Sequence, residues 1–555
     1  MKHNILLAFA IGGAFMSATA CNDDEEIFYA PQVTLETSSR EAFFPVEGGQ
    51  KTVFVSSNAS SWSYDCEEDW IIIIKDNDRL VLSADKNLDP DSRTAVITIY
   101  AAADPETGDA DKNTAVKRFK LVQAGNSVVD LSAAGTANCY MTGTSASCSF
   151  SAKVKGNGKG DGYSKYIENC GLEIKDVAYA DLLWEATFDA DRTRSGKIID
   201  GSPVYDSATG TVWFKTGESE GNAVIAVCKA DGEVIWSWHI WVTDKPVTTK
   251  SFNNVEWMDR NLGALNNTPG DIANRGTFYQ WGRKDPFMPS SAEYIDMPRH
   301  DYSDNSTETE EQAAEIDAEL SKLRPLANVF NTQVGDGVAK WVLADYVPNI
   351  CFTAPGNIPP SVANPTKFFQ CQSSSLGDYI FDWYLVLDKA DYSGDSDRLY
   401  MQSHSHLWGE SEVAESSDKP TVPQTGYKSI FDPCPPGYVV PTQGSYATVD
   451  AGQWLDIVTD DWVRADYGYV WAKGTGDYFP CAGAMSVSGK LSYTGEDMMY
   501  WSAKELDNSN YGKAGGLVSL YHYVAFGAVY ENNPFTDFYS FGARCWAAPV
   551  RCVKE

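Results

Sequence analysis

Residues 221–244, GNAVIAVCKADGEVIWSWHIWVTD, restrict the fold of this chain more than any other stretch. An Asp-Gly pair separates two apolar runs, which is a strong signal for a β-hairpin. In the second run one set of alternating side chains is Val234, Trp236, Trp238, Ile240 and Val242, and the other is Ile235, Ser237, His239 and Trp241. Because both sets are bulky, we expect this strand to lie inside a β-sandwich, buried on both faces. The lone histidine of the strand, His239, is predicted to be a hydrogen-bonded core residue and not a ligand.

Residues 31–125 carry strand signals throughout, at intervals of roughly ten residues with polar turns between them, which predicts another sandwich. The stretches VEGGQKTVFVSSNASSWSY, DWIIII, LVLSADKNLDPDSRTAVITIYA and LVQAG resemble a BACON domain, an immunoglobulin-like module common at the N-termini of Bacteroidetes surface proteins. The resemblance implies a stalk. Trp62 and Trp70 are predicted to be core residues of this unit and not sugar-stacking rings.

Residues 126–247 are expected to form a second immunoglobulin-like sandwich around the hairpin. ANCYMTGTSASCSFSAKVKGNG at 137–158, taken with the hairpin, resembles a module that lies between N-terminal domains and C-terminal modules in Bacteroidetes lipoproteins. The resemblance implies no activity, so this unit is expected to act as a spacer.

From residue 248 onwards the sequence pattern changes. The blocks VEWMDRNLGAL, RGTFYQWGRKDPF, CPPGYVVPT, DYFPCAGAMS, YWSAKE and SFGARCWAAPVRCVKE occur in that order. They resemble the Fibrobacter succinogenes major paralogous domain, whose pattern is in turn similar to C-type-lectin-like domains. The resemblance implies an α+β domain over residues 248–555 with a long loop insertion at about 288–430. Within the insertion, Thr307 and Glu310 match a capping box ahead of a helix. The chain is therefore expected to be mainly β and multidomain.

The N-terminus predicts export. A weakly basic start, the apolar run ILLAFAIGGAFM and the small residues SATA describe a signal peptide over residues 1–20. Ala18-Thr19-Ala20-Cys21 resembles a bacterial lipobox, which implies a lipid on Cys21, although ordinary cleavage after Ala20 is the alternative. The acidic tether at 21–30 resembles the tag of surface-exposed lipoproteins in Bacteroidetes-type bacteria. We therefore expect a lipid-anchored protein on the outer membrane, held there by acyl chains alone.

The net charge and the absence of catalytic motifs exclude several classes of function. The chain has 44 basic and 76 acidic residues, a formal net charge of −32, which argues against nucleic acid or an anionic membrane surface as a partner. No nucleophile elbow, zinc-protease helix or phosphate-binding loop is present, so the protein is predicted not to be an enzyme. A hydrolase with two facing carboxylates stays open but nothing favours it. His404 and His406 form a conceivable metal pair without a third ligand nearby.

The cysteines after Cys21 fall into three groups along the chain. The groups are Cys66 alone, then Cys139, Cys148, Cys170 and Cys228, then Cys351, Cys371, Cys434, Cys481, Cys545 and Cys552. Because both larger groups are even, they are expected to form disulfides in an exported chain, with Cys66 as the one free thiol. Cys139 and Cys148 bracket a plausible hairpin and can cross-link it.

Cys434 stands in the proline-rich stretch FDPCPPGYVVPT, where a reactive thiol and a structural clamp are the two alternatives. No basic cluster surrounds Cys434 to lower its pKa, so the clamp is favoured, with Cys545 or Cys552 as partner. Thr442 is predicted to cap a following helix.

Two candidate ligand sites remain. The loop YENNPFTD offers the oxygen ligands Glu531, Asn532, Asn533 and Asp537 for calcium, but their order does not match the C-type-lectin motif, and an Asn/Pro turn is the alternative. Trp408, which precedes a glycine, is predicted to be an exposed ring for sugar stacking. The family-block tryptophans Trp257, Trp281 and Trp501 are assigned to packing. Calcium is thus the one candidate cofactor.

These expectations combine into a non-enzymatic surface lipoprotein. Its C-terminal domain is predicted to bind an external glycan or glycoprotein, for adhesion or glycan capture, and the N-terminal domains form the stalk. The alternative is a structural or accessory subunit of a surface fibre or complex, with a protein partner and no affinity for sugar.

Overall fold

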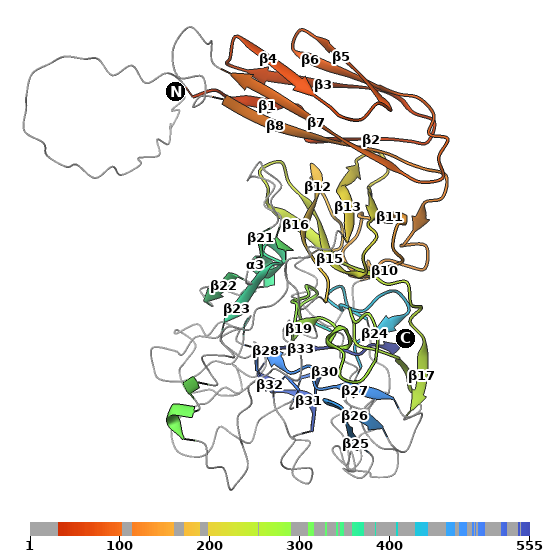
Figure 1. Ribbon diagram of the computed structural model, residues 1–555, viewed down its shortest axis with the longest axis vertical. Helices are drawn as coiled ribbons and strands as arrows, with labels where there is room; N and C mark the ends of the chain where they lie inside the picture. Colours follow the sequence, from red (N-terminus) through yellow and green to blue (C-terminus); the bar gives the residue numbers. More distant parts are fainter. Residues whose placement is uncertain are drawn as a thin grey trace, which may run out of the picture.

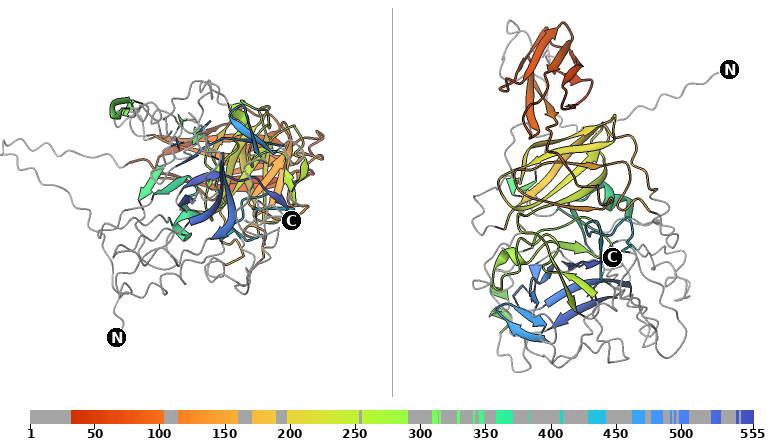
Figure 2. Two further views of the ribbon diagram at one scale, coloured as in Figure 1. Left: turned by 90° about the horizontal axis from the view of Figure 1, so that it is seen from below. Right: turned by 90° about the vertical axis from the view of Figure 1, so that its right-hand side faces the viewer.

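The computed structural model shows a mainly β protein whose regions follow one another along the longest axis of the molecule (Figure 1). The right-hand view of Figure 2 shows the same succession from the side. The structure describes residues 32–102, 114–159, 171–188, 198–252, 255–289, 309–312, 314–315, 328–329, 340–341, 345–348, 358–370, 383, 407–408, 428–441, 462–471, 477–485, 491–492, 494–495, 498–505, 523–529, 542–543 and 546–555.

The first region consists of two four-stranded sheets. One contains, in order, β1 (Leu35–Thr37), β3 (Gly49–Ser57), β6 (Arg79–Ala84) and β5 (Ile71–Asp76). The other contains β2 (Glu41–Phe44), β8 (Thr114–Gln123), β7 (Arg93–Ala102) and β4 (Ser61–Asp65). Inward-facing residues of both sheets, such as Leu80 and Ile97, form one buried core. Trp62 and Trp70 pack against this core and are partly buried, in agreement with the packing role predicted for them.

The second region also has two sheets. The larger contains β10 (Cys139–Thr142), β16 (Val234–Val242), β15 (Gly221–Cys228), β12 (Tyr179–Ala186), β20 (Asn328–Val329) and β21 (Lys340–Trp341). The smaller contains β13 (Ile199–Asp206), β14 (Thr211–Thr216), β11 (Ser147–Ser151) and β9 (Val129–Asp130). The predicted hairpin is confirmed as β15 and β16, and β16 is an inner strand between β15 and β10. Strands β20 and β21 come from the expected insertion and extend this sheet.

The C-terminal region contains several small sheets. Two of them have four strands: β17 (Thr249–Phe252), β18 (Val255–Met258), β34 (Val553–Lys554) and β24 (Tyr438–Val439), and β19 (Phe278–Gln280), β33 (Ala547–Pro549), β28 (Ala484–Met485) and β29 (Leu491–Ser492). The others contain β25 (Trp462–Ala465), β26 (Gly468–Trp471) and β27 (Tyr478–Pro480); β30 (Met498–Glu505), β31 (Tyr523–Val529) and β32 (Gly542–Ala543); and β22 (Asp345–Pro348) with β23 (Lys367–Gln370). The short helices η2 (Ile272–Asn274) and α3 (Ile358–Ala363) accompany them. Because β34 pairs with both β18 and β24, the two ends of this region meet in one sheet.

The hydrophobic core does not stop at residue 247. One buried cluster contains Trp236 and Trp238 of β16 together with Trp281, Trp408 and Phe431 of the C-terminal region. The second region and the C-terminal region therefore share a core, and neither can be removed without exposing apolar surface on the other.

A capping box is present in the insertion, but two residues later than predicted. The backbone N–H of Thr309 donates to Gln312 Oε1 over 2.9 Å, and the N–H of Gln312 donates to Thr309 Oγ1 over 3.2 Å. The sequence TETEEQ fits the motif in two frames, and the helical residues begin at Glu310, which makes Thr309 the cap. Thr307 and the helix expected after Thr442 lie outside the described residues.

The cysteines follow the predicted grouping only in part. Cys434 is bonded to Cys552, one of its two expected partners, with the Cα atoms 6.1 Å apart. Three cysteines expected in disulfides are instead thiols, namely Cys139, Cys148 and Cys228, and Cys481 is buried in the C-terminal region. The proposed 139–148 bridge is wrong because β10 and β11 belong to different sheets and are not the arms of one hairpin. Four more candidates, Cys170, Cys351, Cys371 and Cys545, lie outside the described residues.

Alkylation of the unfolded but unreduced protein tests this assignment. A thiol reagent is expected to modify Cys139, Cys148 and Cys228, and to leave Cys434 and Cys552 blocked until a reductant is added. Peptide mass spectrometry with and without reductant reads out each site. If Cys139 and Cys148 both resist the reagent until a reductant is added, they form a disulfide with each other and the assignment of the two as thiols is wrong.

Candidate functional site

Strand β19 and the turn after it bring a group of charged side chains into the interior. Arg283, Lys284 and Asp285 are all buried where the C-terminal region packs on β16. Removing such charges from water costs several kcal/mol for each ion unless it is paired and hydrogen-bonded. The partners of these three residues therefore decide whether the group is a reactive site or a packed one.

Lys284 and Asp285 meet Ser237 of β16. Lys284 Nζ donates to Asp285 Oδ1 over 2.6 Å and to the carbonyl oxygen of Ser237 over 3.1 Å, and it also contacts Ser237 Oγ. Ser237 Oγ donates to Asp285 Oδ1 over 2.7 Å. A serine beside a lysine is one form of activated nucleophile. Here, however, each of the three residues is at most 3% exposed, and the ammonium group is held by a carboxylate. The arrangement is a buried ion pair that joins two regions.

His239 lies two residues further along β16 and has partners on both ring nitrogens. Tyr279 Oη donates to His239 Nδ1 over 2.9 Å, and Nε2 donates to Asn222 Oδ1 over 2.8 Å. Asn222 in turn donates to the carbonyl oxygen of Gly263. Burial lowers the pKa of His239 to about 3, so the ring stays neutral and keeps these roles at physiological pH. The prediction of a hydrogen-bonded core histidine is confirmed.

Three tryptophans surround the segment 279–283. The indole N–H groups of Trp501, Trp383 and Trp408 donate to the carbonyl oxygens of Tyr279, Trp281 and Arg283, over 2.7, 2.7 and 3.1 Å. The carbonyl oxygens of alternate residues along the segment are thus satisfied by side chains from three distant parts of the chain.

The prediction that Trp408 is an exposed ring for sugar is wrong. Trp408 is fully buried, with its ring 5.7 Å from that of Trp281, and its N–H group is used by a buried carbonyl oxygen. Trp257, Trp281 and Trp501 are fully buried, as their assignment to packing requires.

Arg283 attaches part of the insertion to β19. Its guanidinium donates to the carbonyl oxygen of Lys367 over 2.7 Å and to Gln280 Oε1 over 2.9 Å. The rings of Phe369 and Trp383 lie 5.2 and 5.8 Å from it. Burial lowers the pKa of Arg283 to about 10, which still leaves it charged. Arg283 therefore stabilises the docked position of α3 and β23.

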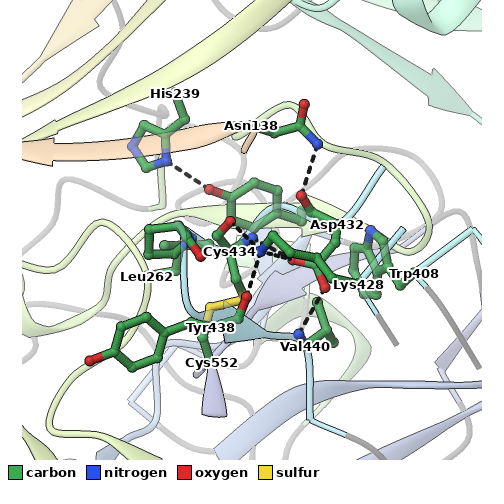
Figure 3. The surroundings of a disulfide bond; sticks show 12 residues. Asn138, His239, Leu262, Trp408, Lys428, Asp432, Cys434, Tyr438, Val440 and Cys552 are labelled. Carbon is green, nitrogen blue, oxygen red and sulfur yellow. Dashed lines mark hydrogen bonds and ion pairs between the residues drawn. A yellow bond between two sulfur atoms is a disulfide. The ribbon is translucent and has the colours of Figure 1, made fainter. Parts of the chain in front are cut away.

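The proline-rich stretch is held by charges around the disulfide (Figure 3). Lys428 Nζ donates to Asp432 Oδ1 over 3.2 Å and to the carbonyl oxygens of Cys434, Pro435 and Tyr438. Burial raises the pKa of Asp432, and the ammonium of Lys428 opposes this rise. Asn138 of the second region donates to the carbonyl oxygens of Ile430 and Asp432. The Cys434 segment is thus a clamp between regions, with no reactive thiol.

The other candidate ligands fall where the structure gives no description. Residues Cys21, His404, His406, Glu531, Asn532, Asn533 and Asp537 all lie outside the described ranges. Within the described ranges, no group of three or more His, Cys, Asp or Glu side chains is placed to hold a metal ion. The same part of the chain contains no helix long and apolar enough to cross a membrane. Calcium binding at 530–537 therefore stays a prediction.

No protein-family model matches the chain, and no curated protein does. Among solved structures, it is similar to a Bacteroides ovatus GH5 xyloglucanase in complex with a XXXG heptasaccharide, with 16% identity over 19% of this chain and 21% of that chain and a TM-score of 0.14. A Bacteroides thetaiotaomicron protein solved by NMR matches with 16% identity over 19% of this chain and 98% of its own, at a TM-score of 0.13. The E. coli chaperone DraB matches with 9% identity over 38% of this chain and 96% of its own, at 0.18. The chain thus spans about a fifth of the xyloglucanase, and similarity at such TM-scores carries no argument about fold or function.

Replacing Trp408 tests whether its N–H group is buried and bonded. Trp408→Phe keeps an aromatic ring but leaves the carbonyl oxygen of Arg283 without its donor, which costs about 1–3 kcal/mol of unfolding free energy beyond the loss of ring volume. Urea unfolding measures the difference.

The matched control is Trp241→Phe. Trp241 is also fully buried, but its N–H group has no hydrogen-bond partner in the described part of the chain, so only ring volume is lost. An equal loss of unfolding free energy in the two variants, or no loss in Trp408→Phe, would contradict the hydrogen bond from Trp408 to Arg283.

Proposed function

We propose that this protein is a non-enzymatic, lipid-anchored protein of the bacterial outer surface whose C-terminal region binds an external glycan or glycoprotein. The predicted signal peptide and the lipobox-like sequence ending at Cys21 support export and anchoring. The resemblances to a BACON domain and to the Fibrobacter succinogenes major paralogous domain belong to this proposal.

The observation that carries the proposal is the order of the regions in space. The described chain begins in the first region, at one end of the molecule, and the C-terminal region lies at the other end, with the second region between them (Figure 1). An anchor before residue 32 therefore leaves the C-terminal region facing away from the membrane. This is the arrangement that a binding protein on a stalk needs.

The buried tryptophans narrow where a ligand can bind. Trp281, Trp408 and Trp501 are used in packing, so none of them offers a face for sugar stacking. We place the binding site on the loop at 530–537, where Glu531 and Asp537 are the carboxylates available to calcium.

A specific observation favours the second candidate, a structural or accessory role in a surface complex. The first region exposes large apolar side chains on the outer face of one sheet, with Phe54, Ile72 and Ile74 all more than half exposed. On the other sheet Tyr100 and Val116, directly opposite each other in β7 and β8, are exposed too. Exposed apolar groups of this kind are typical of protein contacts.

Binding to a glycan array separates the two candidates. The mature chain without lipid, residues 22–555, is applied to mucin and plant glycans with calcium or with a chelator. Because the second and C-terminal regions share a core, the whole chain is used and not residues 248–555 alone. We expect binding to a subset of glycans, weakened about tenfold or more by chelation and by Asp537→Asn.

The matched control is Glu47→Gln, which removes a carboxylate from an exposed position of the first region and is expected to leave binding unchanged. Binding that does not need calcium would exclude the 530–537 loop as a metal site. Absence of binding in both conditions would favour the structural role.

A further inference from the structure

The joint between the first and second regions has a small apolar part. Phe43 of β2 stacks on Trp213 of β14 with ring centroids 4.5 Å apart, and Val122, Ala124 and Val204 complete the buried cluster. Between the last strand of the first region and the first strand of the second, the chain crosses this joint once, through residues 124–128. Regions joined in this way move relative to each other unless the interface holds them, so the polar contacts at the joint matter.

One carboxyl group is at the centre of these polar contacts. Glu41 of β2 is only 7% exposed, and its Oε1 atom accepts hydrogen bonds from the backbone N–H of Ala180 over 2.9 Å and of Tyr205 over 2.7 Å. Ala180 lies in β12 and Tyr205 in β13, which belong to different sheets of the second region. A single oxygen of the first region therefore holds both sheets of the second.

The other oxygen of the same carboxyl group, Oε2, is buried and has no hydrogen-bond partner in the described part of the chain. Lys120 of β8 attracts the Glu41 carboxylate, but Lys120 is itself paired at 3.2 Å with Asp181 of β12, whose negative charge acts on Glu41 in the opposite direction. An ionised carboxylate in this position lacks the hydration and the full set of donors that it has in water.

The remaining charged or titratable groups at the joint are engaged elsewhere. Arg40, next to Glu41, lies over the ring of Tyr179 of β12 and donates to the carbonyl oxygen of Ala230. On β13, Asp206 accepts hydrogen bonds from the turn that follows it. Cys228 of β15 is a buried thiol, and the tyrosine side chains of Tyr179 and Tyr205 are neutral over the relevant pH range because burial raises the pKa of each. Among the described residues, Lys120 is the one cation that acts appreciably on the Glu41 carboxyl group.

We propose that the protonation of Glu41 controls the docking of the first region on the second: the joint is closed when the carboxyl group is neutral and opens when it ionises. Opening exposes the carboxylate to water and releases the N–H groups of Ala180 and Tyr205. This control does not depend on what the C-terminal region binds. Opening the joint changes the orientation of the C-terminal region relative to the first region.

The direction of the pH effect follows from the pKa of Glu41. Burial raises it from 4.5 to about 8 in the docked state, with Lys120 and the two backbone N–H groups opposing the rise. In the open state the solvated carboxyl returns to its ordinary value. Between these two pH values the docked state holds a proton that the open state has lost, so docking weakens by about tenfold per pH unit as pH rises, and is constant outside this window.

Hydrogen exchange of the full mature chain tests the proposal. The exchange rates of the Ala180 and Tyr205 amides are measured from pH 5.5 to 7.5 and corrected for intrinsic chemical exchange. We expect the opening constant at these two amides to rise about a hundredfold over this range, while amides in the centre of the β15–β16 hairpin show no such change.

Two variants complete the experiment. Glu41→Gln has no titrating group and is expected to abolish the pH dependence, whereas Glu47→Gln, an exposed acid of the same region, is expected to keep it. A pH-independent opening constant in the wild type, or a slope that persists in Glu41→Gln, would overturn the proposal. If Glu41→Gln does not fold, carbon NMR of the Glu41 carboxyl in the wild type decides instead: a midpoint clearly above 4.5, between the values of the open and docked states, supports the proposal, and one near 4.5 refutes it.

Discussion

The structure depends on strand β16 being buried on both of its faces. Trp238 packs inside the second region with its ring 4.8 Å from that of Phe150. Ser237 and His239, on the alternate face, bind Lys284, Asp285 and Tyr279 of the C-terminal region. A strand whose two faces pack against residues of both regions cannot be fully buried by either region alone. The second region is therefore better understood as the base of the C-terminal region than as a separate spacer.

Charges and the disulfide strengthen the same junction from its C-terminal side. The buried ammonium of Lys428 and the Cys434–Cys552 bond hold a proline-rich segment against Asn138 of the second region. Cys434 and Cys552 are far apart in the sequence, and a disulfide that closes so long a loop stabilises the fold mainly by restricting the unfolded chain. By contrast, the joint of the first region on the second relies on a small apolar cluster and on Glu41. The molecule thus has one rigid junction and one that responds to proton binding.

Alternation along the sequence was sufficient to predict β15 and β16, since a hairpin and a doubly buried strand are local properties. Alternation cannot show which partner covers the second face. Ser237 and Lys284 are 47 positions apart, and a Gly-Arg-Lys-Asp run ordinarily indicates a solvated turn. The same limit explains Glu41, whose burial depends on strands more than 100 residues away in the chain.

The incorrect predictions share a physical cause. Trp408 was expected to be exposed because a glycine follows it, but a backbone carbonyl oxygen at Arg283 needed a donor, and sequence does not reveal that need. Cys139 and Cys148 were candidates for a bridge because they are close in sequence, whereas strand pairing places them in different sheets. In each case a tertiary partner, which no local pattern specifies, decided the position.

Dissection of the chain tests the shared core most directly. Residues 126–247, 248–555 and 126–555 are expressed separately, and near-ultraviolet circular dichroism and cooperative unfolding in urea are measured for each. The shared core predicts that only 126–555 has fixed aromatic packing and a cooperative transition, because each shorter fragment exposes the face that β16 and β19 bury together. A cooperative transition for residues 126–247 alone, with native-like aromatic signals, would contradict this account.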